Sequence, residues 1–177
     1  MKKPVIFVLS ILLLSIVASL SMSFEPANAG ELTISSPAFE NNSNIPDTYT
    51  CKGKNISPPL LIGNIPASAK SLALVLEDPD APSGIFVHWV MWNIPPGTRE
   101  ISENSSPRGA QQGLNDFRKR GYIGPCPPSG THRYFFKIYV LDTLLRLQSG
   151  SAKKDLEKAM KGHIIDQASL TGLFQRR

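Results

Sequence analysis

Prolines divide this 177-residue chain into short segments, because the chain contains fifteen of them and they recur along its whole length. Proline lacks a backbone donor and breaks the interior of a helix or a central strand. The apolar runs between the prolines are therefore expected to be strands. Residues 71–77 (SLALVLE) stop at Asp78-Pro79, and residues 86–94 (FVHWVMWNI) stop at a Pro-Pro-Gly turn. Both predict interior strands.

A third strand is predicted at residues 133–141, where apolar and polar side chains alternate with a period of two. Four side chains would share one face: Tyr134, Phe136, Ile138 and Val140. Shorter apolar segments at 32–34, 60–62 and 164–174 predict further strands. One helix is expected, capped by Ser151 and terminated by Gly162. This pattern predicts a mostly antiparallel β-sandwich with one or two peripheral helices, forming a single domain from residue 30 to residue 177.

The first 29 residues have a different character. Two lysines precede an apolar run from Val5 to Leu20, and the segment closes with Ala27-Asn28-Ala29. This is the pattern of a secretory signal peptide cleaved after Ala29, and it predicts a periplasmic or secreted protein. An uncleaved membrane anchor is the alternative, although the apolar run is shorter than the about 20 residues that comfortably span a bilayer.

Two features of composition limit the function. The chain has two cysteines, Cys51 and Cys126, and an exported chain with an even number of cysteines is expected to pair them. Two free thiols or half of a metal site are the alternatives. The net charge is +5, with clusters at residues 118–120 and 176–177. No base-reading motif accompanies these clusters, so they predict solvated basic faces and no nucleic-acid partner.

Three proline-bounded loops are expected to meet at one end of the sandwich. They would bring together two aspartates, two histidines, an arginine and a tyrosine: Asp78, Asp80, His88, His132, Arg133 and Tyr134. A proline-rich loop loses little conformational entropy on ordering, so it can hold an imidazole in place. Imidazoles, with backbone N–H groups around Gly124 and Gly130, would donate to an anion, and a carboxylate could meet an ammonium group. The predicted ligand is a phosphorylated small molecule or a phospholipid headgroup.

Structural roles are the alternatives for these residues. Strand alternation places His88 on the same side as Phe86, Val90 and Trp92, where it could be a neutral core histidine. The two aspartates could make only local turn hydrogen bonds. In the segment GLNDF, Asn115 and Asp116 could anchor a loop that enters the pocket or form a purely structural turn.

Four segments carry a family resemblance: DPDAPSG, HW, GPCPPSGTHRYFFKIYVLD and AMKGHII. They resemble the phosphatidylethanolamine-binding protein family, in its bacterial Raf-kinase-inhibitor-like branch, over nearly the whole chain after residue 50. The resemblance implies a β-sandwich with one small anion pocket formed by Asp78, Asp80, His88 and His132. Pro127, Arg133 and Tyr134 lie on the matching segment. It also implies the cysteine pair of exported relatives, a possible homodimer, and in some members inhibition of a kinase or protease.

Motifs of catalysis are missing from the sequence. It contains no Gly-x-Ser-x-Gly elbow, Walker loop or His-Glu-x-x-His helix, which favours a binding protein over an enzyme. A hydrolase acting on a phosphoester or ester through His88 or His132, oriented by Asp78, is the alternative. Carboxylates and imidazoles also bind divalent metals, but their spacing here matches no metal motif, so neither a metal nor a cofactor is expected.

Overall fold

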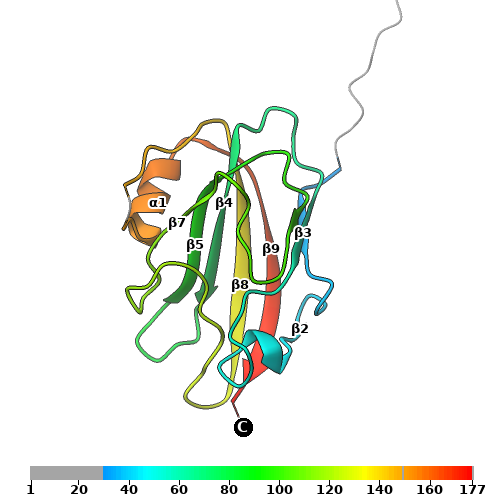
Figure 1. Ribbon diagram of the computed structural model, residues 1–177, viewed down its shortest axis with the longest axis vertical. Helices are drawn as coiled ribbons and strands as arrows, with labels where there is room; N and C mark the ends of the chain where they lie inside the picture. The colour runs from blue at the N-terminus through cyan, green and yellow to red at the C-terminus, as the bar shows by residue number, and fades with distance from the viewer. Residues whose placement is uncertain (1–29, 149, 177) are drawn as a thin grey trace, which may run out of the picture.

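The computed structural model describes residues 30–148 and 150–176, which form two β-sheets and one α-helix (Figure 1). This confirms the predicted fold class. The expected signal peptide, residues 1–29, lies outside the described residues. Within the described ranges, no helix has the length and apolar character needed to cross a bilayer.

The larger sheet has six strands in the order β2-β9-β8-β4-β5-β7. Their bounds are Ser43–Asn44 (β2), Ser71–Asp78 (β4), Phe86–Ile94 (β5), Gln111–Gln112 (β7), Thr131–Leu141 (β8) and Ile164–Gln175 (β9). The pairing of β2 with β9 is parallel and the other pairings are antiparallel. The smaller, antiparallel sheet contains Thr33–Ser35 (β1), Leu60–Gly63 (β3) and Glu100–Ile101 (β6) in the order β1-β3-β6.

The main core lies between the two sheets and follows the predicted alternation of β8. The four side chains of β8 that point into this core, Tyr134, Phe136, Ile138 and Val140, have no exposed surface. A second apolar cluster fills the space between the other face of the large sheet and the helix α1 (Lys153–Met160). Strand β4 is buried along its whole length because both faces of the sheet are covered there. This explains its continuous apolar sequence.

A β-bulge changes the direction of side chains on β5. Leu76 of β4 lies opposite Trp89, but the next residue, Glu77, lies opposite Val87, so His88 is an extra residue in the ladder. Beyond the bulge, Trp89 faces the core between the sheets, whereas Val90 and Trp92 face α1. The prediction from simple alternation that His88 shares a side with Val90 and Trp92 is therefore wrong.

The helix α1 begins one residue later than expected. Ala152, and not Ser151, occupies the N-cap position, and its backbone N–H donates to the Asp155 carboxylate at 2.9 Å. At the other end, Gly162 has a φ of +81°, a left-handed conformation that ends a helix with little strain when the residue is glycine. Figure 1 shows α1 near one end of the large sheet and the 3-10 helix η1 (Asp47–Tyr49) near the opposite end.

Candidate functional site

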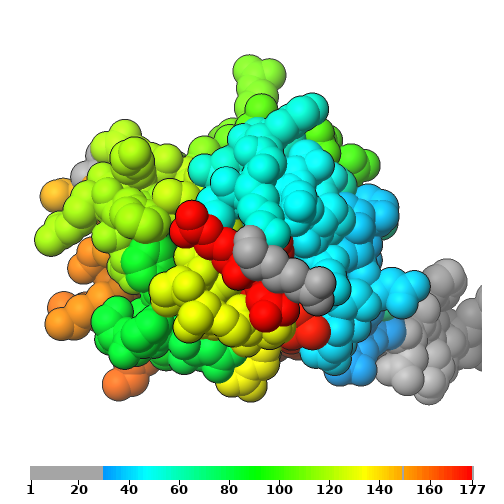
Figure 2. All heavy atoms as spheres, turned by 90° about the horizontal axis from the view of Figure 1, so that it is seen from below, coloured from blue at the N-terminus to red at the C-terminus, as the bar shows by residue number. Residues whose placement is uncertain are grey.

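The loops at the end of the sandwich opposite α1 enclose a cavity of about 290 Å³. β4 ends there, and β5 and β8 begin there. Seen from that end, residues 45–56 (cyan) and the end of β9 (red) lie on one face with the loops that precede β5 and β8 (Figure 2). Five of the seven predicted site residues line the cavity: Asp78, His88, Pro127, His132 and Tyr134.

His132 forms a buried pair with Asp78. Its Nδ1 lies 2.7 Å from Asp78 Oδ2, and the two side chains are only 9% and 5% exposed. The second carboxylate oxygen of Asp78 accepts a hydrogen bond from the backbone N–H of Asp80 at 2.8 Å. Asp78 therefore both orients the imidazole and holds the turn after β4. Because Nδ1 is engaged, Nε2 is the nitrogen of His132 that can meet a ligand.

His88 is held as a neutral imidazole. Its Nδ1 donates to the carbonyl oxygen of Ile123 at 2.9 Å, and its ring makes edge contacts with Phe86 and Tyr134. Burial lowers the pKa of His88, although the Ile123 carbonyl and the charge of Asp78 partly oppose this effect. With the proton on Nδ1, the lone pair of Nε2 can accept a hydrogen bond.

Tyr134 contributes a buried hydroxyl to the cavity wall. No hydrogen bond of normal geometry to this hydroxyl occurs among residues 30–148 and 150–176, although the Asp78 carboxylate and the backbone N–H of Cys126 lie near it. Burial, followed by the negative charge of Asp78, raises its pKa, so the group stays protonated at neutral pH. A buried donor without an acceptor is costly, and such groups are rare in native proteins.

Asp80 and Arg133 lie beside the cavity and do not line it. The Arg133 guanidinium makes two bonds to the Asp80 carboxylate, from Nε at 2.9 Å and from Nη2 at 2.6 Å, and the Arg133 backbone N–H adds a third. Hydrogen bonding to Arg133 lowers the pKa of Asp80 to about 2. The pair ties the turn after β4 to the start of β8, and direct contact of either residue with a ligand stays a prediction.

Asn115 and Asp116 anchor the loop that forms one side of the cavity. The Asp116 carboxylate accepts the backbone N–H of Val87 at 2.7 Å, which joins the loop to β5. The Asn115 side-chain oxygen accepts the backbone N–H groups of Phe117 and Lys119. Asp116 therefore anchors the loop to β5, whereas Asn115 makes the hydrogen bonds of a local turn, so the segment has both structural roles.

The disulfide predicted from the two cysteines is present between Cys51 and Cys126, and both residues line the cavity. It joins the turn after η1 to the proline-rich loop before β8. One expected donor at this place is not available. The backbone N–H of Gly124 donates to the side chain of Asn55 at 2.7 Å and therefore cannot also bind an anion.

Much of the cavity wall was not predicted from the sequence. The additional residues include Asn55, Ser83, Phe86, Phe117, Ile123 and Pro128. They lie on three different loops and at the first position of β5, and they share no local pattern with the histidines. Only the proline content of the segment before β8 marked part of this wall in advance, because prolines stiffen a loop.

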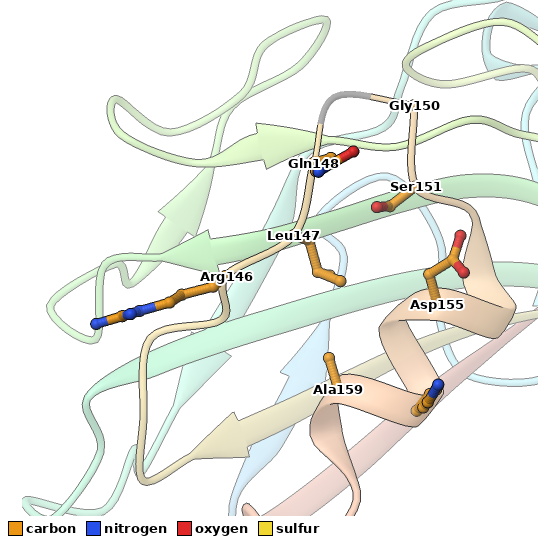
Figure 3. A pocket seen from close by; sticks show the side chains of 8 residues that line it. Arg146, Leu147, Gln148, Gly150, Ser151, Asp155 and Ala159 are labelled. Atoms are coloured by element: carbon orange, nitrogen blue, oxygen red, sulfur yellow. The ribbon is translucent and has the colours of Figure 1, made fainter.

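Other parts of the described chain offer less chemistry. A hollow of about 590 Å³ lies between the β8–α1 connection and α1 (Figure 3). Arg146 points away from the other side chains there, and Asp155 is engaged in the helix cap. Within the two described ranges, no group of three or more His, Cys, Asp or Glu side chains is placed to hold a metal ion.

Two packed sheets with a small, histidine-lined cavity among the loops at one end define a β-sandwich of a recognisable class. The chain belongs to the phosphatidylethanolamine-binding protein family, whose sequence model matches residues 35–175. It is 49% identical over 150 residues to a UPF0098 protein of Methanothermobacter thermautotrophicus, and the match covers 82% of this chain and 99% of the relative. A UPF0098 protein of Aquifex aeolicus is 44% identical, and the match covers 89% of this chain and 98% of the relative.

Two solved structures have the same fold. One is a phosphatidylethanolamine-binding protein homolog from Chlamydia trachomatis, with 40% identity and a TM-score of 0.80. The other is Escherichia coli YbcL, described as a member of the mammalian family, with 29% identity and a TM-score of 0.78. Each comparison covers 83% of this chain and 99% of the solved chain.

The lowered pKa of His88 predicts that acid destabilises the protein. The unfolded chain takes up a proton at this histidine near its ordinary pKa of 6.5, whereas the folded protein does so only at lower pH. The contribution to stability is therefore complete above 6.5 and is lost as the pH falls below it. The lowered pKa of Asp80 makes a separate contribution to stability, which is complete above its ordinary pKa of 3.8 and is lost as the pH falls toward about 2.

Urea unfolding at about pH 7.5, about pH 6.5 and about pH 5.5 measures this effect. The free energy of unfolding of wild type should decrease as the pH is lowered. The decrease should be smaller for His88→Asn, because asparagine keeps a hydrogen-bond donor but cannot take up a proton. An equal loss in both proteins would contradict the role assigned to His88.

Proposed function

We propose that the cavity binds a small phosphorylated group, such as phosphoethanolamine or the headgroup of a phospholipid. The observation that carries the proposal is the buried Tyr134 hydroxyl, which makes no hydrogen bond of normal geometry within the described residues and lies in the same cavity as the oriented His132–Asp78 pair. A volume of about 290 Å³ is near the lower end of ligand pockets, which span about 300–1,000 Å³. It suits a headgroup better than a whole lipid.

Each polar group has a role in such a complex. The His132 imidazolium would donate from Nε2 to a phosphate oxygen, while Asp78 on Nδ1 stabilises its positive charge. The Tyr134 hydroxyl would donate to a second oxygen. Neutral His88 would accept a hydrogen bond at Nε2 from a P–OH group or from the ammonium of ethanolamine. The family's name and that of the Chlamydia relative support this choice of ligand.

We also propose that the protein acts outside the cytoplasm, as the signal-peptide pattern of residues 1–29 implies. In support, both Cys51 and Cys126 are exposed to solvent in the disulfide. Exposed disulfides persist in oxidising compartments and are reduced in the cytosol.

Calorimetric titration with inorganic phosphate and with phosphoethanolamine tests the pocket. We expect wild type to bind and His132→Ala to bind about 30-fold or more weakly, because a hydrogen bond to a charged group is worth about 2 kcal/mol.

The chain contains a matched control for this variant. His163 forms a similar pair with Asp142 at 2.8 Å, but both side chains are about half exposed and neither lines the cavity. His163→Ala should therefore bind phosphate as wild type does. Equal heats from wild type and His132→Ala would reject the pocket. Turnover of chromogenic phosphate or carboxylate esters that disappears in His132→Ala would favour the hydrolase instead.

A further inference from the structure

Two large apolar side chains are exposed at the rim of the cavity. Phe117 is 56% exposed and Ile85 is 55% exposed. The Phe117 ring packs edge-on against Phe86 at 5.0 Å, and Ile85 precedes Phe86 in the chain, so the two exposed residues belong to loops that meet at this place. Single exposed apolar residues are ordinary in soluble proteins. Two such residues on adjoining loops at a cavity mouth form a small apolar patch.

The protein holds Phe117 in this exposed position. The backbone N–H of Phe117 donates to the side chain of Asn115, which is only 3% exposed, and Asp116 joins the loop to Val87 through two hydrogen bonds. Arg118 has a φ of +58°, which turns the chain sharply after the phenyl ring. The exposure of this ring is therefore a fixed feature of a tethered turn and not the result of a loose loop.

Positive charge surrounds the apolar patch. Residues 118–120, which directly follow Phe117, are Arg-Lys-Arg and all are exposed. The segments that gather on this face (Figure 2) are residues 45–56, 78–86, 115–133 and 174–176, and together they carry seven basic and four acidic side chains. The Asp80–Arg133 ion pair removes one charge of each sign, which leaves six basic and three acidic side chains on this face.

We propose that Phe117, Ile85 and residues 118–120 form a membrane-docking surface that binds bilayers containing anionic phospholipids. The phenyl ring would enter the headgroup region, where aromatic side chains are favoured, and the basic side chains would contact anionic headgroups. The cavity would then open toward the bilayer. An acidic protein segment would match the charge, but it would leave the exposed phenyl ring unexplained. Phe117 also forms part of the cavity wall, but Ile85 and residues 118–120 do not line the cavity, so the proposal does not depend on what the cavity holds.

Vesicle flotation tests this surface with residues 30–177, which exclude the apolar N-terminal segment. Each match to a solved relative covers 99% of that relative but only 83% of this chain. The relatives therefore adopt this fold without a counterpart to the remaining 17% of this chain, and we expect residues 30–177 to fold alone. We expect stronger binding to phosphatidylcholine vesicles containing about one third phosphatidylglycerol than to pure phosphatidylcholine. High salt should abolish the difference.

Variants separate the two contributions. Phe117→Ser should weaken binding to the anionic vesicles about tenfold, because the ring loses its apolar contact. Arg118→Gln and Lys119→Gln should each weaken it about fivefold. A matched control, Leu144→Ser with Lys158→Gln and Lys161→Gln, removes an equally exposed apolar side chain and two charges near the opposite end of the molecule. The control should bind as wild type does.

His132→Ala distinguishes this proposal from the function proposed for the cavity. It should keep binding to the anionic vesicles even if it no longer binds phosphate, because His132 is buried and lies outside the docking surface. Equal binding of wild type to both vesicles, or equal losses in Phe117→Ser and the matched control, would overturn the proposal. Binding to soluble polyglutamate without binding to vesicles would also overturn it and indicate an acidic protein partner.

Discussion

Replacing Cys51 and Cys126 together by serine is expected to lower the free energy of unfolding by about 4 kcal/mol. The disulfide joins residues separated by 75 positions, so it strongly restricts the unfolded chain. It also has a local effect, because both cysteines line the cavity and connect the turn after η1 to the loop before β8. Urea unfolding of wild type and the double variant measures the loss of stability.

Reduction of wild type gives an independent comparison. Both cysteines are exposed, so dithiothreitol should reach the bond, and reduced wild type should unfold at the same urea concentration as the double variant. Phosphate affinity should fall in both, because one side of the cavity loses its covalent connection. A change in unfolding free energy below about 1 kcal/mol would mean that the hydrogen bonds between these segments suffice without the disulfide.

Gly124→Ala is expected to cost about 3 kcal/mol and to disturb phosphate binding. A Cβ at this position would lie 2.5 Å from the Tyr49 carbonyl oxygen and 2.9 Å from the Thr50 Cα. Both are backbone atoms at the end of η1, which packs directly against Gly124. The two segments are also held together by Tyr122 Oη, which donates to the Tyr49 carbonyl at 2.6 Å. A methyl group would therefore force apart the two segments that carry the disulfide.

Gly97→Ala is the matched control for this substitution. A Cβ at Gly97 would meet no atom within 4 Å, and its backbone is not in the left-handed region. Its unfolding free energy should stay close to that of wild type. Thermal unfolding and phosphate titration of both variants give the comparison, and equal stability of Gly124→Ala and Gly97→Ala would show that the segments separate at little cost.

The architecture was largely predictable because its main signals are local. The strands β4, β5 and β8 were identified from apolar runs ended by prolines and from alternation, and the disulfide from an even number of cysteines. The two-residue strands β2, β6 and β7 were not identified, since two residues cannot display a period. Their hydrogen bonds depend on neighbours distant in the chain.

The candidate site was predictable only in part. Convergence of Asp78, His88 and His132 on one cavity agrees with the expectation that three proline-bounded loops meet. The predicted side of β5 for the His88 side chain is wrong, because the bulge opposite Leu76 and Glu77 depends on how β5 pairs with β4. The sequence also did not predict that Asp80 and Arg133 lie beside the cavity and do not line it. These two residues bind each other, and local patterns do not reveal a hydrogen bond between residues 53 positions apart.

The sequence by itself determined the strand-based class of the fold, the family, and the residue types that could meet a phosphorylated group. Tertiary structure alone decided which nitrogen of each histidine is engaged, that the buried Tyr134 hydroxyl makes no hydrogen bond of normal geometry within the described residues, and that Phe117 is exposed beside a basic turn. The physical reason is distance along the chain. Periodicity and turn chemistry act over a few residues, whereas the cavity is made by contacts between segments separated by dozens of residues.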